Sequence, residues 1–191
     1  MSEPDPLAPQ LVAIESLDDS RVADYRHVRE ADLVGRRGVF IAEGEMVLAV
    51  LAVQRHFAIR SVLLGRNRLD KLRPLLLQMD PAVPIYLAEA AIMDELVGFK
   101  IHRGVLAVGE RSSPPSAEDL IRNLDGTSRL VVALEALTNH DNVGGVFRNA
   151  CAFGADAVLL DARCCDPLYR KAIRVSAGGC LRVPYARCAS T

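Results

Sequence analysis

The residues with the clearest chemical potential lie in one short segment, TNHDNVGGVFRNACAFG, between the apolar runs LVVALEAL and ADAVLL. Apolar residues recur there at helical spacing, which predicts a helix from about Asn142 to Phe153. Val143, Phe147, Ala150 and Cys151 share the face expected to pack on a sheet. Gly144, Gly145 and Arg148 fall on another stripe, which carries almost no side chains. Small residues allow a backbone or a ligand to approach closely, and arginine offers a fixed fork of donors.

Each of these residues also has a plainer interpretation. Asp141 and Asn142 could cap the helix. The glycines could serve a helix–helix contact, and Arg148 could be an ordinary surface arginine. A dinucleotide-binding fingerprint is excluded, because only the Gly144–Gly145 pair is present and the spacing is wrong.

The elements that would position this segment alternate between strand and helix patterns. Residues 39–44, 60–65, 83–89 and 104–110 read as strands, separated by helical stretches at 45–57, 69–79 and 89–98. Ser116 and Asp119 form a capping box for a short helix over 117–124. Strands over 129–137 and 155–161 then flank the helix described above, and 180–186 resembles a further strand. A strand–helix–strand unit this tight implies a parallel pair, with ligand sites at the carboxyl ends of its strands.

We therefore expect four regions along the chain. Residues 1–19 are acidic and Pro-rich and are expected to form a disordered tail. Residues 20–110 form an α/β unit, 111–128 a linker with a short helix, and 129–191 a second α/β unit with a parallel sheet.

Composition narrows the class of protein. The chain has 191 residues, half of them apolar, and a net charge of −1. No apolar run approaches the ~20 residues that span a bilayer, so no membrane is expected and a cytoplasmic location is the default. The five cysteines all follow residue 150 without a CxxC spacing, which predicts reduced thiols rather than a disulfide framework or a metal site. Thiol chemistry at Cys164–Cys165 is a weaker alternative.

Two segments carry a resemblance to a known family. TNHDNVGGVFRNACAFGADAVLLD resembles the first motif of the SpoU (TrmH-like) RNA ribose methyltransferases, in which an Asn–x–Gly…Arg pattern follows the first strand of the catalytic domain. DPLYRKAIRVSAGGCLRVPYA is similar to the segment that follows, with its Lys/Arg-rich turn and Ser–x–Gly step. VFIAEG and GFKIHRGVLAV resemble pieces of the small ribosomal-protein-like substrate-binding domain that these enzymes often carry.

The resemblance implies a fold and an activity. The fold is a ribosomal-protein-like α/β substrate-binding domain followed by an incomplete SPOUT-type (α/β knot) parallel-sheet domain. The activity is transfer of a methyl group from S-adenosylmethionine to a ribose 2′-hydroxyl of rRNA or tRNA. Arg148 matches the family's catalytic arginine, and Asn142 matches the asparagine that shapes the same site. Because arginine is a poor base at pH 7, its expected role is to orient the hydroxyl and stabilise a developing alkoxide.

Candidate RNA contacts come from two further segments. Lys100, His102 and Arg103 precede a strand in an exposed-looking loop. Arg174 and Ser176 lie in the second matching segment. Relatives of this kind act as homodimers, so a homodimer is expected here.

The family's Gly–x–Glu–x–x–Gly and Ser–Leu–Asn–x–Ser stretches, which form most of the methyl-donor pocket, do not occur in residues 1–191. The sequence therefore reads as a truncated piece, with its donor-binding residues expected beyond residue 191 and weak donor binding by itself. The alternative is a noncatalytic RNA-binding or dimerisation module of the same fold.

Overall fold

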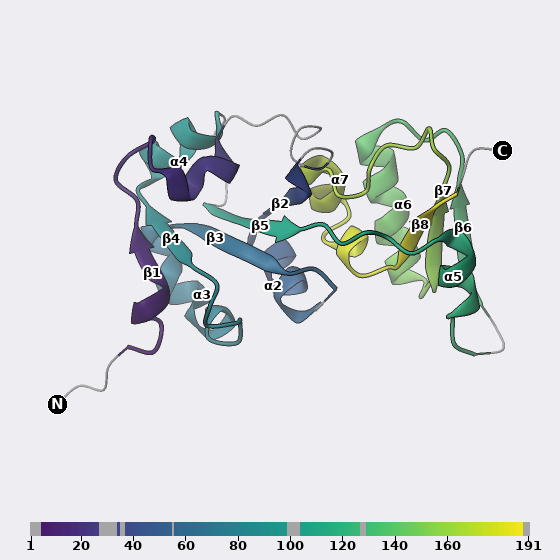
Figure 1. The fold of residues 1–191 in the computed structure, drawn as a ribbon, viewed down its shortest axis with the longest axis horizontal. Helices are drawn as coiled ribbons and strands as arrows, with labels where there is room; N and C mark the ends of the chain where they lie inside the picture. The colour runs from purple at the N-terminus through teal and green to yellow at the C-terminus, as the bar shows by residue number, and fades with distance from the viewer. Residues whose placement is uncertain are drawn as a thin grey trace. The chain divides into compact units, whose positions relative to one another are not determined.

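The computed structural model describes residues 5–26, 34, 37–54, 56–98, 104–126 and 129–188. The chain forms two compact units, Met1–Arg111 and Ser112–Thr191, and each has its own sheet (Figure 1). None of the helices in these ranges is long and apolar enough to cross a membrane.

The first unit is built on a five-stranded sheet of order β1-β4-β3-β5-β2. Its strands are β1 (Leu11–Ala13), β2 (Val39–Glu43), β3 (Ile59–Gly65), β4 (Ile85–Ala88) and β5 (Val105–Glu110). β1, β4 and β3 are parallel, whereas β5 is antiparallel to both β3 and β2. The four strands predicted between residues 39 and 110 are confirmed.

Helices cover both faces of this sheet (Figure 1). They are α2 (Glu45–Val53), α3 (Leu69–Leu76) and α4 (Ala90–Val97), with short 3₁₀ helices η1 (Ala8–Gln10), η2 (Ser20–Tyr25) and η4 (Arg66–Arg68). Met93 and Leu96 of α4 join Val22 and Tyr25 of η2 in a core cluster on one face. α2 and α3 pack together on the other.

The prediction of a disordered tail over residues 1–19 was wrong for residues 5–19. Leu11–Ala13 forms β1, which pairs in parallel with Ile85–Leu87 of β4. Leu7 and Ile14 on either side of it are buried, with exposed fractions of 0% and 1%. Burial of these two side chains stabilises the edge strand despite the acidic, Pro-rich sequence around it.

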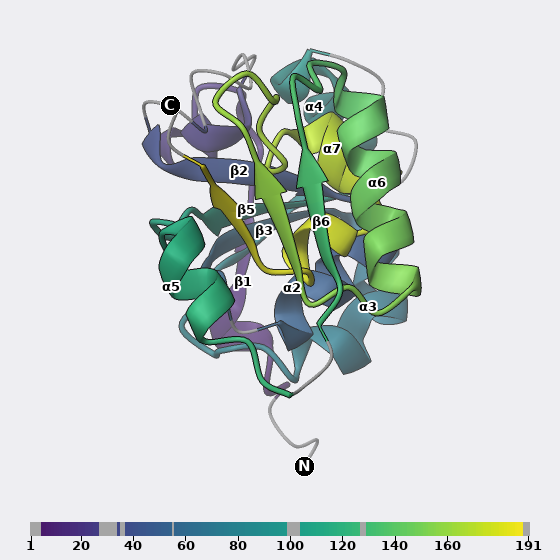
Figure 2. The ribbon, with the colours of Figure 1, turned by 90° about the vertical axis from the view of Figure 1, so that its right-hand side faces the viewer.

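The second unit has a three-stranded parallel sheet of order β6-β7-β8. Its strands are β6 (Val131–Leu134), β7 (Ala157–Leu160) and β8 (Tyr185–Arg187), and its helices are α5 (Ala117–Arg122), α6 (His140–Ala152), α7 (Arg170–Val175) and the 3₁₀ helix η5 (Gly179–Leu181). Figure 2 shows α5 and α6 on opposite sides of the sheet. Leu120 of α5 packs on Ala157 and Ala186. The ring of Phe147 on α6 contacts the Tyr185 ring edge to face, with the ring centroids 5.9 Å apart. The predicted α/β class with a parallel sheet is confirmed.

Two predicted strands of this unit are shorter than expected. β6 stops at Leu134, because Ala136 has a φ of +50° and cannot continue an extended strand. The run predicted as a strand over 180–186 begins as η5, and only Tyr185–Arg187 pairs with β7. The cap predicted from Ser116 and Asp119 is confirmed, since the Ser116 hydroxyl accepts from the Asp119 amide at 3.0 Å.

Candidate functional site

The site is built on α6, which follows the carboxyl end of β6. Its N-cap is Asn139, whose side-chain oxygen accepts from the amides of Asp141 at 2.8 Å and Asn142 at 3.2 Å. The helix therefore begins earlier than the sequence predicted, and neither Asp141 nor Asn142 is its cap. Asn142 lies exposed in the first turn. Arg148 lies six residues further along the helix, which corresponds to a net rotation of about 120° about the helix axis. The two residues therefore lie on different sides of α6.

The bare stripe of α6 is a packing surface at one glycine and open at the other. A Cβ added to Gly144 would lie 2.6 Å from the carbonyl oxygen of Ala172 and 3.0 Å from the Cβ of Val175, both on α7. A Cβ added to Gly145 would meet nothing within 4 Å. Gly144 thus serves helix–helix contact, whereas Gly145 leaves open surface.

Arg148 stands beside a tight turn that joins α7 to η5. A Cβ added to Gly179 would lie 2.9 Å from the Phe147 carbonyl oxygen and 3.3 Å from the Arg148 Cα. The Arg148 side chain is exposed, and it makes no ion pair or hydrogen bond with another residue in the described part of the chain. Its guanidinium is therefore available to a ligand that reaches this side of α6.

The turn itself is held by Ser176. The residue is 1% exposed, and its hydroxyl donates to the Ile173 carbonyl at 2.9 Å and accepts from the Cys180 amide at 3.2 Å. Ala177 and Gly178 follow with φ values of +52° and +83°. Ser176 was expected to contact RNA, but its hydroxyl is used inside the turn, so its structural role is to shape the loop beside Arg148.

The other expected RNA contacts divide into two groups. Arg174 lies in the last turn of α7 with its side chain exposed. Lys100, His102 and Arg103 lie outside the described residues.

The amino-terminal ends of α6 and α7 are joined by contacts that sequence reasoning missed. The ring centroids of His140 and Tyr169 lie 4.5 Å apart. The Nζ of Lys171 lies 2.7 Å from the Asp141 carboxylate. The His140 Nε2 is buried without a partner among the described residues. No spacing in the sequence links these pairs, because the fold alone brings the two helix ends together.

A hydrogen-bonded network closes the carboxyl ends of β6, β7 and β8. The Cys164 thiol donates to the Leu134 carbonyl at 3.3 Å and accepts from the Leu137 amide at 3.4 Å. The Arg187 guanidinium donates to the carbonyl oxygens of Asp161 at 3.2 Å and Cys164 at 3.1 Å. The neighbouring Cys164 side chain and the Arg163 guanidinium hold the pKa of Asp161 well below its usual range. These strand ends are thus fixed relative to one another.

The cysteines carry no sign of activated chemistry. All five are free thiols, and Cys164 and Cys180 are buried. Burial raises the pKa of Cys164, Cys165 and Cys180, which disfavours the reactive thiolate. Within the ranges that the structure describes, no three His, Cys, Asp or Glu side chains are grouped to hold a metal ion.

The curated relatives that the chain matches are RNA methyltransferases by name. The chain is 40% identical over 179 residues to an uncharacterized tRNA/rRNA methyltransferase of Mycobacterium tuberculosis, covering 90% of this chain and 59% of that protein. It is 27% identical to one of Synechocystis, covering 94% of this chain and 63% of the relative. The chain thus spans about three fifths of the length of these relatives.

Solved structures share the fold. An AdoMet-bound rRNA methyltransferase from Sinorhizobium meliloti has a TM-score of 0.75 at 20% identity, covering 95% of this chain and 66% of that chain. The SpoU methyltransferase AviRb from Streptomyces viridochromogenes, in complex with AdoMet, has a TM-score of 0.70 at 22% identity, covering 91% and 63%.

The SpoU rRNA Methylase family model matches residues 129–191, which include α6, the turn beside Arg148 and all three strands of the second sheet. The same region carries the Asn142, Gly144 and Arg148 pattern and the Ser176–Gly179 turn. With the similar relatives and the shared fold, this match shows that the chain resembles the SpoU methyltransferases.

Proposed function

We propose that this chain is the substrate-binding and first catalytic part of an RNA methyltransferase that modifies a ribose 2′-hydroxyl of rRNA or tRNA. The observation that carries the proposal is the exposed guanidinium of Arg148, unpaired within the described residues, beside the Ser176–Gly179 turn. The names of the relatives support an RNA substrate. A solved RNA 2′-O ribose methyltransferase with the same fold, at a TM-score of 0.64, supports the ribose as the target.

Arg148 is proposed to act on the hydroxyl by electrostatics. A guanidinium keeps its proton at neutral pH, so it cannot serve as an ordinary general base. Two of its N–H groups can instead bind the hydroxyl oxygen and stabilise negative charge that develops there. Asn142 lies in the first turn of the same helix and is proposed to shape the entrance to the site. Arg174, with Lys100, His102 and Arg103, is proposed to bind RNA phosphates.

S-adenosylmethionine is the proposed methyl donor, since AdoMet-bound structures share this fold. The described residues do not fit it by themselves. At the carboxyl ends of β6 and β7, several polar groups are already used: the Leu134 carbonyl and Leu137 amide by Cys164, and the Leu137 carbonyl by the Cys165 amide at 3.0 Å. The nearby carboxylates of Glu135 and Asp161 both pair with Arg163 at 3.0 Å. Few groups remain to recognise an adenosine, so weak donor binding is expected from these residues alone.

This misfit favours one second candidate, a noncatalytic RNA-binding or dimerisation module of the same fold. Calorimetry separates the two at the level of the 191-residue chain. Micromolar affinity for S-adenosylmethionine would contradict the expected weak binding and favour a complete active site. A homodimer in the cytoplasm is part of the proposal, and equilibrium sedimentation of the chain tests the dimer.

Methyl transfer tests the proposed function directly. Isotope-labelled S-adenosylmethionine is supplied with bulk rRNA and tRNA to the longest product of the gene, and the label is sought in alkali-resistant dinucleotides, which report 2′-O-methylation. Arg148→Ala is expected to reduce transfer about 100-fold or more, because it removes charge stabilisation at the reacting oxygen. Arg122→Ala, an exposed arginine on α5, is the matched control. Label on a base, or full activity of Arg148→Ala, would refute the proposal.

A further inference from the structure

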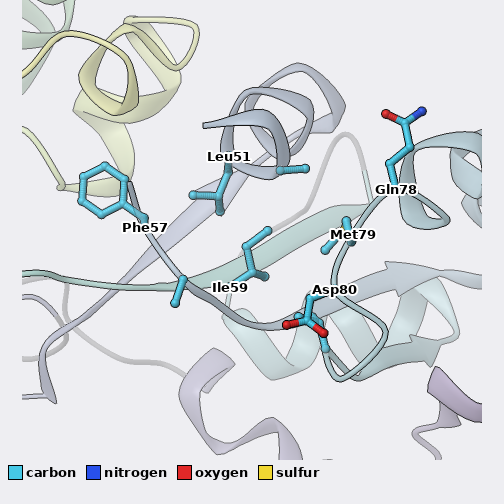
Figure 3. Close-up of a pocket in the computed structure, with 9 residues that line it drawn as sticks. Leu51, Phe57, Ile59, Gln78, Met79 and Asp80 are labelled. Atoms are coloured by element: carbon cyan, nitrogen blue, oxygen red, sulfur yellow. The ribbon is translucent and has the colours of Figure 1, made fainter. Parts of the chain in front are cut away.

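The first unit contains a pocket that the proposed methyl-transfer site does not use. It has a volume of about 530 Å³. Residues from the last turn of α2, the start of β3 and the segment between α3 and β4 line it (Figure 3). All of them belong to the first unit, so the pocket is complete without any other part of the chain.

The middle of the pocket is apolar. Figure 3 shows the side chains of Leu51, Ile59 and Met79 grouped there, with Phe57 at one end. Leu51 is 1% exposed and Met79 is 8% exposed, so both belong to the core of the unit. The Phe57 ring is held by Phe40 in an edge-to-face contact with centroids 5.2 Å apart. A firm apolar floor of this kind suits an aliphatic or aromatic group of a ligand.

The polar groups at the other end are acceptors or negative charges. Asp80 accepts from the Ala82 amide at 2.8 Å, and no cation pairs with its carboxylate among the described residues. The Gln78 Nε2 donates to the Pro74 carbonyl at 3.0 Å, which leaves its Oε1 as an acceptor. The carboxyl ends of α2 and α3 border the same pocket and add partial negative charge. No Lys, Arg or His is among the described residues that line the pocket, so these residues offer no cation to a phosphate.

The apolar surface continues outside the pocket. Val53 is 67% exposed and Leu77 is 48% exposed, and each is next in sequence to a lining residue, Ala52 or Gln78. Exposed apolar side chains next in sequence to the lining residues favour an occupant larger than a single ammonium or guanidinium group.

We propose that this pocket docks a segment of a partner protein in which apolar side chains alternate with lysine or arginine. An apolar side chain fills the space over Leu51 and Met79, its neighbours cover Val53 and Leu77, and the cation meets the Asp80 carboxylate. The contact with Asp80 is exposed, so it contributes selectivity for a cation more than affinity. The proposal does not depend on methyl transfer, because no residue of the second unit takes part.

A pair of designed peptides tests this docking on the full 191-residue chain. The probe is a fluorescein-labelled Gly-Leu-Lys-Leu-Arg-Leu-Gly peptide, and its partner has glutamate in place of both cations. We expect saturable binding of the basic peptide only, measured by fluorescence anisotropy, with NMR shift changes confined to the pocket residues. Asp80→Asn should weaken binding about two- to fivefold, in line with one exposed ion pair, and Asp80→Lys by more.

Asp125→Lys on the exposed surface of the second unit is the matched control and should leave binding unchanged. Equal binding of the acidic peptide, or no response to Asp80→Lys in a folded variant, would overturn the proposal. So would shift changes at Phe57 and Met79 caused by a short single-stranded RNA. Shift changes at the same residues on concentrating the chain alone would also overturn it, since a second copy would then be the occupant.

Discussion

Gly144 of α6 faces Ala172 of α7 so closely that a Cβ on the glycine would lie 2.6 Å from the Ala172 carbonyl oxygen. The clashing atom is backbone in a packed helix, so it cannot move aside as a flexible side chain would. Gly144→Ala is therefore expected to destabilise the second unit by about 1–3 kcal/mol, as overpacking does in well-filled cores. Urea unfolding followed by circular dichroism measures the loss.

Gly145→Ala is the matched control for this prediction. It makes the same chemical change one residue further along the same helix, where a Cβ would meet nothing within 4 Å. An alanine in a helix interior is more stable than a glycine by roughly 0.5–1 kcal/mol, so this variant is expected to gain stability. Equal effects of the two substitutions would show that α7 does not pack on Gly144 as described.

The Gly144–Gly145 pair shows which contacts could be predicted from the sequence and which could not. Adjacent glycines in a helix predict the close approach of another backbone or of a ligand, because glycine is less stable than alanine in a helix interior. They do not say what comes close, since α7 lies almost thirty residues further along the chain. The Ser116 cap was predictable because both partners lie within one helical turn.

Where the structure of a segment depends on residues far away in the sequence, the local pattern predicted it wrongly. Leu11–Ala13 forms a strand only because β4, some seventy residues away, offers an edge for it. Cys180 and Leu181 have the apolar character of a strand, yet Ser176 binds the Cys180 amide and turns the chain into η5. At the site, Arg148 could be found from its family pattern, whereas the buried role of Ser176 depends on the turn that surrounds it.

A buried hydroxyl pair anchors η2 to the first sheet. The Tyr25 hydroxyl lies 2.9 Å from the Ser61 hydroxyl, and the two residues are 4% and 5% exposed. Tyr25→Phe or Ser61→Ala removes one partner from a dry site, and each is expected to cost about 1–3 kcal/mol. The double variant should cost less than the sum of the two, because it leaves neither hydroxyl behind. Strictly additive losses in urea unfolding would contradict this coupling.

The free thiols should differ sharply in reactivity. Burial raises the pKa of Cys180 to about 12, and it also raises the pKa of Cys164 and Cys165. Iodoacetamide at pH 7.5 is therefore expected to label the half-buried Cys151 before any of these three, as measured by mass spectrometry of peptides over time. Labelling in urea, where all five should react, is the control. Rapid native labelling of Cys164 or Cys165 would instead support thiol chemistry at that pair.

Asp161 should make the second unit sensitive to acid. Its carboxylate lies beside the Cys164 side chain and is bound by the Arg163 guanidinium, and both lower its pKa in the folded state. The unfolded chain, with a pKa of about 3.9, then binds a proton more readily than the folded one. The stabilisation is therefore complete above about pH 5 and declines as the pH falls through about 4 towards the folded pKa.

Asp161→Asn isolates this contribution. The amide keeps an oxygen that can accept from the Arg163 and Cys164 amides, at 3.1 and 2.9 Å in the native protein, but it lacks the charge that meets the Arg163 guanidinium. The variant is expected to unfold at lower urea than the native chain at pH 7, and the gap should narrow below about pH 4 as the native carboxylate is protonated. Asp125→Asn, at an exposed residue without a partner in the described chain, should show no such trend. A gap that stays constant from pH 7 to 3 would mean that the Asp161 charge does not hold the strand ends together, and that its oxygen atoms act only as neutral acceptors.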